Sequence, residues 1–182
     1  MLRTAYLTDL DLMLAWRNHP EVRRVSLNQH VITPEEHATW WQATEGDPTR
    51  QVLVYERDGH PAGVVSFFDL DDTTRSASWG YYLDLKGLEE RGQTLLAWIE
   101  VQREAVRYAF DSLGLSVLRG EVLATNEAVR QLNRRQRFVE VGSRTVVIEG
   151  HPTEVVDIEL RAENVRRPAQ ASQGEEPARH DD

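Results

Sequence analysis

The sequence contains no cysteine, a single lysine (Lys86) and no long hydrophobic run. The lack of cysteine excludes disulfides, thiolate metal sites and a cysteine nucleophile. No apolar run reaches the ~20 residues of a membrane-spanning helix, and no secretory signal follows Met1, so we expect a cytoplasmic protein with no membrane partner. The formal net charge of -9 argues against general nucleic-acid binding, because Lys and Arg supply most of the affinity for phosphates.

The chain length predicts one domain. With 182 residues, of which 40% are hydrophobic, the chain can build one well-buried core but hardly two. We assign this domain to residues 1–161. Residues 162–182 are rich in Gln, Arg, Glu, Pro and Ala with hardly an apolar side chain, which predicts a disordered polar tail.

Hydrophobic patterns and turn residues predict the elements of this domain. Alternating segments indicate strands at residues 2–7, 51–56, 63–68, 77–83, 117–123, 139–148 and 154–160. Capping residues indicate helices after Thr8, after Thr33, from about Gly92 to Leu113, and after Asn126. Asp58-Gly59 is typical of a hairpin turn. In the longest helix, we expect one face to point toward the core; its residues are Leu95, Ile99, Val106, Ala109 and Phe110.

The segment from Val122 to Leu132 places an apolar strand before Asn126, which caps the next helix, and Phe138 opens the following strand. An ordinary capped strand–helix junction would have the same pattern. Together with the order of the elements, however, the segment resembles the Gcn5-related (GNAT) superfamily of acyl-CoA N-acyltransferases. The resemblance implies a mixed α+β fold with a central, mostly antiparallel seven-stranded sheet and about four helices. It also implies acetyl-CoA as co-substrate.

The N-terminal half resembles a narrower branch of this superfamily. Its motifs are Trp16-Arg17-Asn18, Asn28-Gln29-His30, Thr33-Pro34-Glu35-Glu36-His37 and Ser76-Ala77-Ser78-Trp79-Gly80-Tyr81-Tyr82. They are similar to the amino-sugar N-acetyltransferases of pseudaminic acid biosynthesis. The acceptor would then be a primary amine on a small molecule, an amino sugar or a nucleotide-linked amino sugar. The Trp-Arg-Asn opening also occurs among ribosomal-protein alanine acetyltransferases, so a protein N-terminal acetyltransferase is the alternative.

The same resemblance implies a set of residues around CoA. They are Leu83, Arg91, Gly92, Gln93, Thr94, Asn126, Arg130 and Asn133. In the family, a Gly-rich loop at a helix start holds the pyrophosphate through backbone N–H groups. Here the loop keeps Arg91-Gly92 and Gly87 but adds Glu89 and Glu90. This departure leaves open a catalytically silent relative that binds a ligand or partner.

Three candidates concern proton handling. Asn133 stands where the family usually has a tyrosine that protonates the departing CoA thiolate, and an amide cannot act as an acid at neutral pH. His30 and Tyr81 are the remaining candidates, because histidine changes charge near neutral pH and tyrosine carries a phenol. Arg137 replaces the glycine that commonly precedes Phe138 in the family, at a position that often has a positive φ, so we expect either strain at Arg137 or a different turn.

The resemblance implies an acceptor site formed by Arg17, Asn28, His30, Ser78 and Trp79. Arg17 would bind a phosphate or carboxylate of the acceptor, or alternatively fix the adjacent loop. Strand alternation places Trp79 and Tyr81 on one face and Ser78 and Tyr82 on the other, so Trp79 is alternatively a core residue.

We further expect His37 on an exposed helix face. No metal site is expected, because the six histidines have no ligand spacing. A splayed central strand at 77–83 would offer backbone N–H groups to an oxyanion. The oligomeric state is open, and a homodimer is one possibility.

Overall fold

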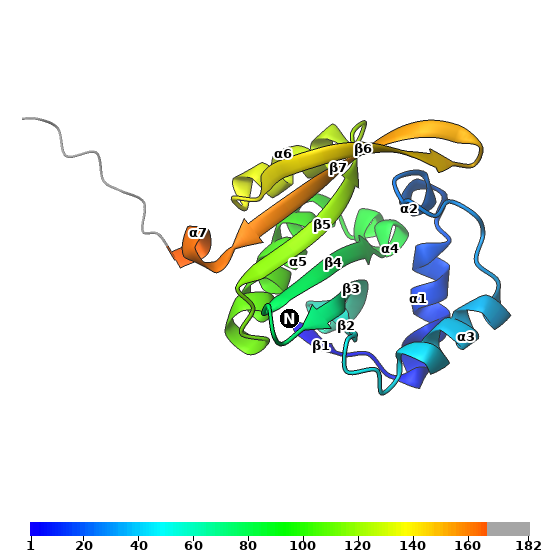
Figure 1. Ribbon diagram of the computed structural model, residues 1–182. Coiled ribbons are helices and arrows are strands. Elements are labelled where there is room, and N and C mark those ends of the chain that lie inside the picture. Colours follow the sequence, from blue (N-terminus) through cyan, green and yellow to red (C-terminus); the bar gives the residue numbers. More distant parts are fainter. Residues whose placement is uncertain (167–182) are drawn as a thin grey trace, which may run out of the picture.

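A computed structural model describes residues 1–166, which form one twisted sheet with helices on both faces (Figure 1). The strands are β1 (Leu2–Thr4), β2 (Gln51–Arg57), β3 (His60–Asp71), β4 (Ser76–Leu83), β5 (Val117–Leu123), β6 (Val139–Ile148) and β7 (His151–Arg161). They are ordered β1-β2-β3-β4-β5-β7-β6. β4 and β5 pair in parallel, and the other neighbours pair antiparallel. The predicted mixed, mostly antiparallel sheet is confirmed.

More helices are present than the four expected. They are α1 (Leu10–Arg17), α2 (Pro20–Arg24), α3 (Pro34–Thr44), α4 (Leu85–Glu90), α5 (Thr94–Arg107), α6 (Glu127–Arg135) and α7 (Ala162–Arg166). A 3₁₀ turn, η1 (Leu7–Asp9), precedes α1, and a π-helical turn, η2 (Tyr108–Ser112), follows α5. The sequence missed α2, α4 and α7, because each is too short to show helical periodicity.

The turns and helix caps that local residue patterns predicted are present. Thr33 caps α3 and forms a reciprocal capping box with Glu36. Asp58 and Gly59 have φ angles of 51° and 78°, as a mirror-type hairpin turn requires. Arg137 has a φ of 68°, so of the two alternatives the turn keeps its left-handed conformation with a residue other than glycine.

Each face of the sheet buries a separate core, and a small third cluster consists of Leu123, Ile148 and Val155. On one face, Ala77, Trp79 and Leu83 of β4 lie in a large cluster with the inner side of α5. On the other face, Tyr82 packs with Met13 of α1 and other residues beneath α1 and α3. Figure 1 shows α1 and α3 (blue to cyan) on the side of the sheet away from α5. The predicted alternation along β4 is confirmed.

β4 and β5 separate partway along their length. They pair from Ser76–Val117 to Ser78–Arg119. Beyond that point β4 continues to pair with β3 as far as Leu83, whereas β5 pairs with β7 as far as Leu123. The second half of β4 therefore lacks a neighbour on one side among the described residues, as expected for a splayed central strand.

Two expectations need correction. Leu95 was expected to face inward, but its side chain is 70% exposed, because α5 turns this position of its first turn to solvent. Residues 162–166 were assigned to the tail, but they form α7, and the Ala162 N–H donates to the Ser116 carbonyl oxygen at 3.0 Å. The expected disorder of residues 167–182 lies outside the described residues. Within residues 1–166 no helix has the length and apolar character to cross a membrane.

Candidate functional site

The segment between α2 and α3 is held by the end of α1. Asn18 donates from Nδ2 to the Ile32 carbonyl oxygen at 2.8 Å, and its Oδ1 accepts from the Ile32 N–H at 2.9 Å. Arg23 adds a bond from Nε to the Gln29 carbonyl oxygen at 2.8 Å. Side chains from one short stretch therefore fix residues 25–33, which we call the acceptor loop.

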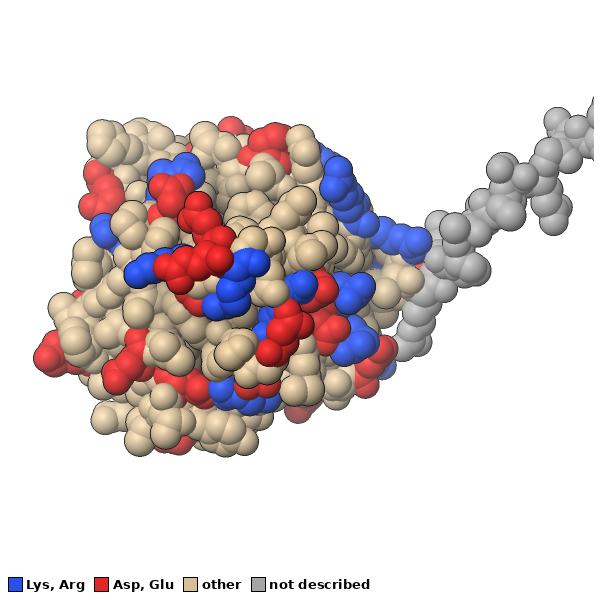
Figure 2. Space-filling model, turned by 180° about the vertical axis from the view of Figure 1, so that it is seen from behind, with Lys and Arg blue, Asp and Glu red and all other residues tan. Residues whose placement is uncertain are grey.

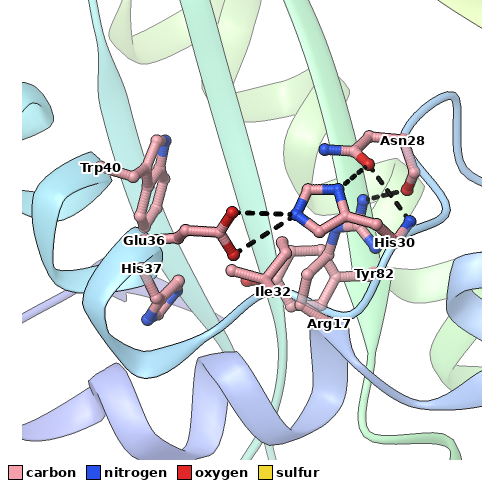
Figure 3. Close-up of a pocket in the computed structure, with 8 residues that line it drawn as sticks. All are labelled: Arg17, Asn28, His30, Ile32, Glu36, His37, Trp40 and Tyr82. Carbon is pink, nitrogen blue, oxygen red and sulfur yellow. Dashed lines mark hydrogen bonds and ion pairs between the residues drawn. The ribbon is translucent and has the colours of Figure 1, made fainter.

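A cavity of about 330 Å³ lies between this loop, α3 and β4 (Figure 3). Its walls are Arg17, Asn28, His30, Ile32, Glu36, His37, Trp40 and Tyr82. The structure thus brings together three of the predicted acceptor residues, Arg17, Asn28 and His30. The sequence interpretation missed Tyr82, Glu36 and Trp40 as lining residues, although the strand alternation had already separated Tyr82 from Trp79.

Arg17 has the second of the two roles that the sequence allowed, because it fixes the adjacent loop. Its Nη2 donates to the Asn28 carbonyl oxygen at 2.7 Å, which holds the acceptor loop. Its Nη1 is buried and has no hydrogen-bond partner within residues 1–166. Burial lowers the pKa of Arg17, although the group remains a guanidinium cation. A buried donor without a partner is costly, so a ligand that accepts a hydrogen bond here would be favoured.

His30 lies at the rim of the cavity between two oxygen-bearing side chains (Figure 3). Its Nδ1 is 2.6 Å from Asn28 Oδ1, and its Nε2 is 3.4 Å from Glu36 Oε2. Glu36 also accepts from the Thr33 N–H at 2.7 Å, and this bond holds the pKa of Glu36 below its usual value. The imidazole is therefore oriented by an amide and by an ionised carboxylate.

His37 was expected on an exposed face, and this prediction is wrong. The residue is 6% exposed, because α3 packs against α1 and turns this position inward. The imidazole stacks on Trp40 with 5.1 Å between ring centroids. Burial lowers the pKa of His37, so the ring is neutral at neutral pH.

Two predicted acceptor residues on β4 lie outside the cavity lining. Trp79 is 6% exposed and is stacked between Tyr81 and Phe138, with centroid distances of 5.4 and 5.7 Å. It is thus a core residue on the α5 face, as the alternative interpretation had it. Ser78 is on the opposite face, at the last pair between β4 and β5, but it does not line the cavity.

Tyr81 and Asn133, both predicted as catalytic candidates, are joined by a residue that the sequence interpretation missed. Gln102 of α5 donates from Nε2 to Tyr81 Oη at 3.2 Å and to Asn133 Oδ1 at 2.8 Å. Gln102 is 0% exposed and Asn133 3% exposed. Burial raises the pKa of Tyr81 to about 12. The only sequence signal for Gln102 was a polar residue on the apolar face of α5.

Fewer main-chain N–H groups are free to bind an anion at the start of α5 than the sequence predicted. The Gly92 N–H donates to the Glu89 carbonyl oxygen at 2.9 Å, and the Gln93 N–H donates to Leu88 at 2.8 Å. The Gln93 side chain donates one hydrogen bond from Nε2 to Asp58 Oδ2 at 2.7 Å. Within residues 1–166 no side chain caps α5. Its first turn, beginning at Thr94, therefore retains N–H groups suited to a pyrophosphate.

The loop before α5 forms α4 and ends in a left-handed glycine. Asp84 caps α4 by accepting from the Gly87 N–H at 3.0 Å, and a side chain at Gly87 would lie 2.0 Å from Asp84 Oδ2. Gly92 has a φ of 63°. Arg91 is 3.7 Å from Asp84, with its side chain 35% exposed, which leaves it accessible to a phosphate. Leu83 is 1% exposed and lies in the main core.

Arg130 and Arg134 of α6 are paired with carboxylates within the protein. Arg130 pairs with Glu140 at 2.9 Å and with Glu127 at 3.1 Å, and Arg134 pairs with the same two carboxylates. Arg130, which was predicted to bind CoA, joins α6 to β6 through Glu140. Asn126 caps α6 through the Val129 N–H at 3.4 Å. Figure 2 shows basic and acidic side chains interspersed over most of the face opposite to the view of Figure 1.

The described residues contain no group of three or more His, Asp or Glu side chains arranged to hold a metal ion.

Comparisons with known proteins agree with this geometry. Residues 1–139 match the family described as "Acetyltransferase (GNAT) domain". Acetyltransferase PseH of Campylobacter jejuni is 27% identical over 132 residues, which are 71% of this chain and 76% of that protein. The structure of spermidine N-acetyltransferase from Vibrio cholerae, in complex with CoA and spermine, has a TM-score of 0.78 at 17% identity. That match covers 91% of this chain and 96% of the other. The structure of spermidine/spermine N-acetyltransferase SpeG from Vibrio cholerae in complex with manganese ions has a TM-score of 0.69 at 18% identity and covers 88% and 91%.

Proposed function

Because this chain belongs to the GNAT family of acetyltransferases, we propose that it transfers the acetyl group of acetyl-CoA to a primary amine of a small acceptor, an amino sugar or a nucleotide-linked amino sugar. The observation that carries the proposal is the partly paired guanidinium of Arg17 in a cavity of about 330 Å³ next to the separated half of β4.

The separated strands and the start of α5 fit acetyl-CoA. Its pantetheine arm would run between β4 and β5, where β4 beyond Ser78 has no described strand paired to it on the β5 side. The first turn of α5, from Thr94, would hold the pyrophosphate through its N–H groups. Acetyl-CoA would supply a thioester carbonyl, and a free N–H of β4 would stabilise the oxyanion formed on it.

Direct transfer in a ternary complex fits the residues present. The chain has no cysteine, so a thioester acyl-enzyme is excluded. The acceptor cavity includes Tyr82, on the α1 and α3 face of β4, and the acetyl-CoA path lies along the same strand. The amine nitrogen would attack the thioester carbon, and the CoA thiolate would leave as the amide forms.

The character of the cavity supports an acceptor with anionic or hydroxyl groups. Arg17 offers a buried cation with a free donor, and Trp40 offers an aromatic surface. Among the described residues that line the cavity, Glu36 is the one carboxylate, and it already faces His30. A polyamine or a protein N-terminus would favour a site rich in acidic groups, because each is a cation in water. The likeness to spermidine acetyltransferases, at 17% identity, concerns the fold alone.

The test uses thiol release from acetyl-CoA with four acceptors: a nucleotide-linked amino sugar, the free amino sugar, spermidine and a peptide with an N-terminal alanine. We expect turnover with the first or second. Arg17→Gln should raise the acceptor KM by about 10-fold or more, because a hydrogen bond to a charged group is worth about 1.5–3 kcal/mol. Arg24→Gln is the matched control, since Arg24 is exposed and pairs with Glu21 outside the cavity.

Two results would contradict the proposal. Turnover of spermidine or of the peptide with both sugars inert would overturn the acceptor class. Calorimetry that detects no binding of CoA at millimolar concentration would overturn the enzymatic function and favour a silent ligand-binding relative.

A further inference from the structure

Half-buried Tyr81 and the buried residues Gln102 and Asn133 form a hydrogen-bonded cluster on the α5 side of β4, within the part that has separated from β5. The three side chains come from β4, α5 and α6. One amide nitrogen of Gln102 donates to both of the others, at 3.2 and 2.8 Å. The Tyr81 hydroxyl is therefore held beside the Asn133 side chain, although the two residues lie far apart in the sequence.

We propose that the Tyr81 hydroxyl donates the hydrogen bond to the CoA sulfur that an α6 tyrosine at position 133 would otherwise supply. This inference rests on the proposed function. Gln102 acts as the positioning residue. Because Tyr81 Oη accepts from Gln102, its own hydrogen remains available, and no described residue accepts it.

The step balances without a further reactant. The amine lone pair forms the C–N bond to the thioester carbon, and the tetrahedral intermediate collapses by breaking the C–S bond. The electron pair leaves on sulfur, where the Tyr81 O–H stabilises it as a hydrogen-bonded thiolate. The amine proton passes to water, so the products are the amide, the CoA thiolate and one proton.

The raised pKa of Tyr81 indicates that its hydroxyl donates a hydrogen bond to the CoA thiolate and does not transfer its proton. Its pKa is raised to about 12 by desolvation, far above the ~8.5 of an ordinary thiol. A phenol this weak keeps its proton when it faces a thiolate. Tyr81 therefore stays neutral through the cycle and acts as a fixed donor toward the charge that develops on sulfur.

The first test removes the hydroxyl in Tyr81→Phe. We expect kcat to fall by about 10- to 100-fold with little change in the KM for acetyl-CoA, since a hydrogen bond to a charged group formed only in the transition state is lost. Tyr108→Phe is the matched control, because the Tyr108 hydroxyl also accepts from a glutamine amide, Gln51 Nε2 at 2.6 Å, but belongs to η2. An unchanged kcat in Tyr81→Phe would overturn the proposal.

Gln102→Leu tests the positioning role. It should lower kcat less than Tyr81→Phe and should have little additional effect in the Tyr81→Phe background. A purely structural role for Gln102 would instead lower kcat by the same factor in both backgrounds.

A second measurement needs no acceptor. A donor to sulfur favours bound thiolate, so the affinity for CoA should rise between pH 7 and pH 10 relative to CoA that lacks its sulfur. Tyr81→Phe should abolish this difference while retaining CoA binding. An equal pH dependence in Tyr81→Phe and the unaltered protein would overturn the proposal. A failure of every variant to bind CoA would instead refute the proposed function itself.

Discussion

Asn18 and Ile32 exchange two hydrogen bonds, through which one side-chain amide satisfies both main-chain polar groups of the loop residue. The neighbouring Trp16 is 8% exposed in the core, and Arg17 bonds the loop at Asn28. The Trp-Arg-Asn motif thus anchors the acceptor loop, places a guanidinium in the cavity and secures α1 to the sheet.

We predict that Asn18→Ala will loosen the acceptor loop. The variant should raise the acceptor KM and lower the free energy of unfolding by about 1–3 kcal/mol, because two main-chain groups lose their partner. Calorimetry should find CoA affinity unchanged, since CoA would bind along β4 and α5. Gln29→Ala is the control, because its side chain makes one exposed bond, to the Arg24 carbonyl oxygen. Equal effects of both variants would contradict the prediction.

The raised pKa of Tyr81 predicts a pH profile. The phenol is neutral below about 12, so kcat should show no descending limb between pH 7 and pH 10 from loss of this donor. Measurement at saturating concentrations of acceptor and acetyl-CoA gives kcat alone, without the pH dependence of binding. A descending limb near neutral pH that persists in Tyr81→Phe would identify a histidine as the proton donor instead.

Two strand glycines should respond differently to alanine. A side chain at Gly63 would lie 2.6 Å from the Tyr82 carbonyl oxygen, so Gly63→Ala must displace β4 from β3. At Gly80 the same atom would meet none of the described residues within 4 Å. We expect Gly63→Ala to cost roughly 1–3 kcal/mol of stability and Gly80→Ala far less. Denaturant unfolding measures both, and an unaffected Gly63→Ala would show that β4 shifts freely.

Asp9 should stabilise the protein in a pH-dependent way. Arg3 binds it at 2.8 Å, and this bond lowers the Asp9 pKa below its usual 3.8. The stabilisation is therefore present above pH 3.8 and is lost as the pH falls through the folded-state pKa. Asp9→Asn should cost about 2 kcal/mol at pH 7, and the difference should shrink in acid. A difference that stays constant down to pH 2 would refute the assignment.

The boundary of the domain can be tested by truncation. Ala162 packs against the main core, and Asn164 accepts a bond from Arg137 Nη1 at 2.8 Å. A chain ending at Arg161 should therefore melt at a lower temperature than one ending at Arg166. Equal melting temperatures would show that α7 contributes nothing to stability.

Features that depend on neighbouring residues could be predicted from the amino-acid sequence. Thr33 and Glu36 start α3, Asn126 caps α6, and Asp58-Gly59 forms a hairpin turn. These signals act through backbone hydrogen bonds that span a few residues, so they are legible without knowledge of the fold. The seven strands were predicted from a different local pattern, the alternation of apolar and polar side chains between turn residues.

Which side chains meet depended instead on how the elements pack in three dimensions. Packing buried His37 against Trp40, paired Arg130 with Glu140, and joined Tyr81 to Asn133 through Gln102. In this protein, the residue that neutralises a charge or forms a hydrogen bond with a buried amide mostly belongs to another helix or strand. The packing of the layers decides which residue that is. Sequence spacing carries no information on that choice, because the free energy of a buried polar group depends on the atoms around it in space.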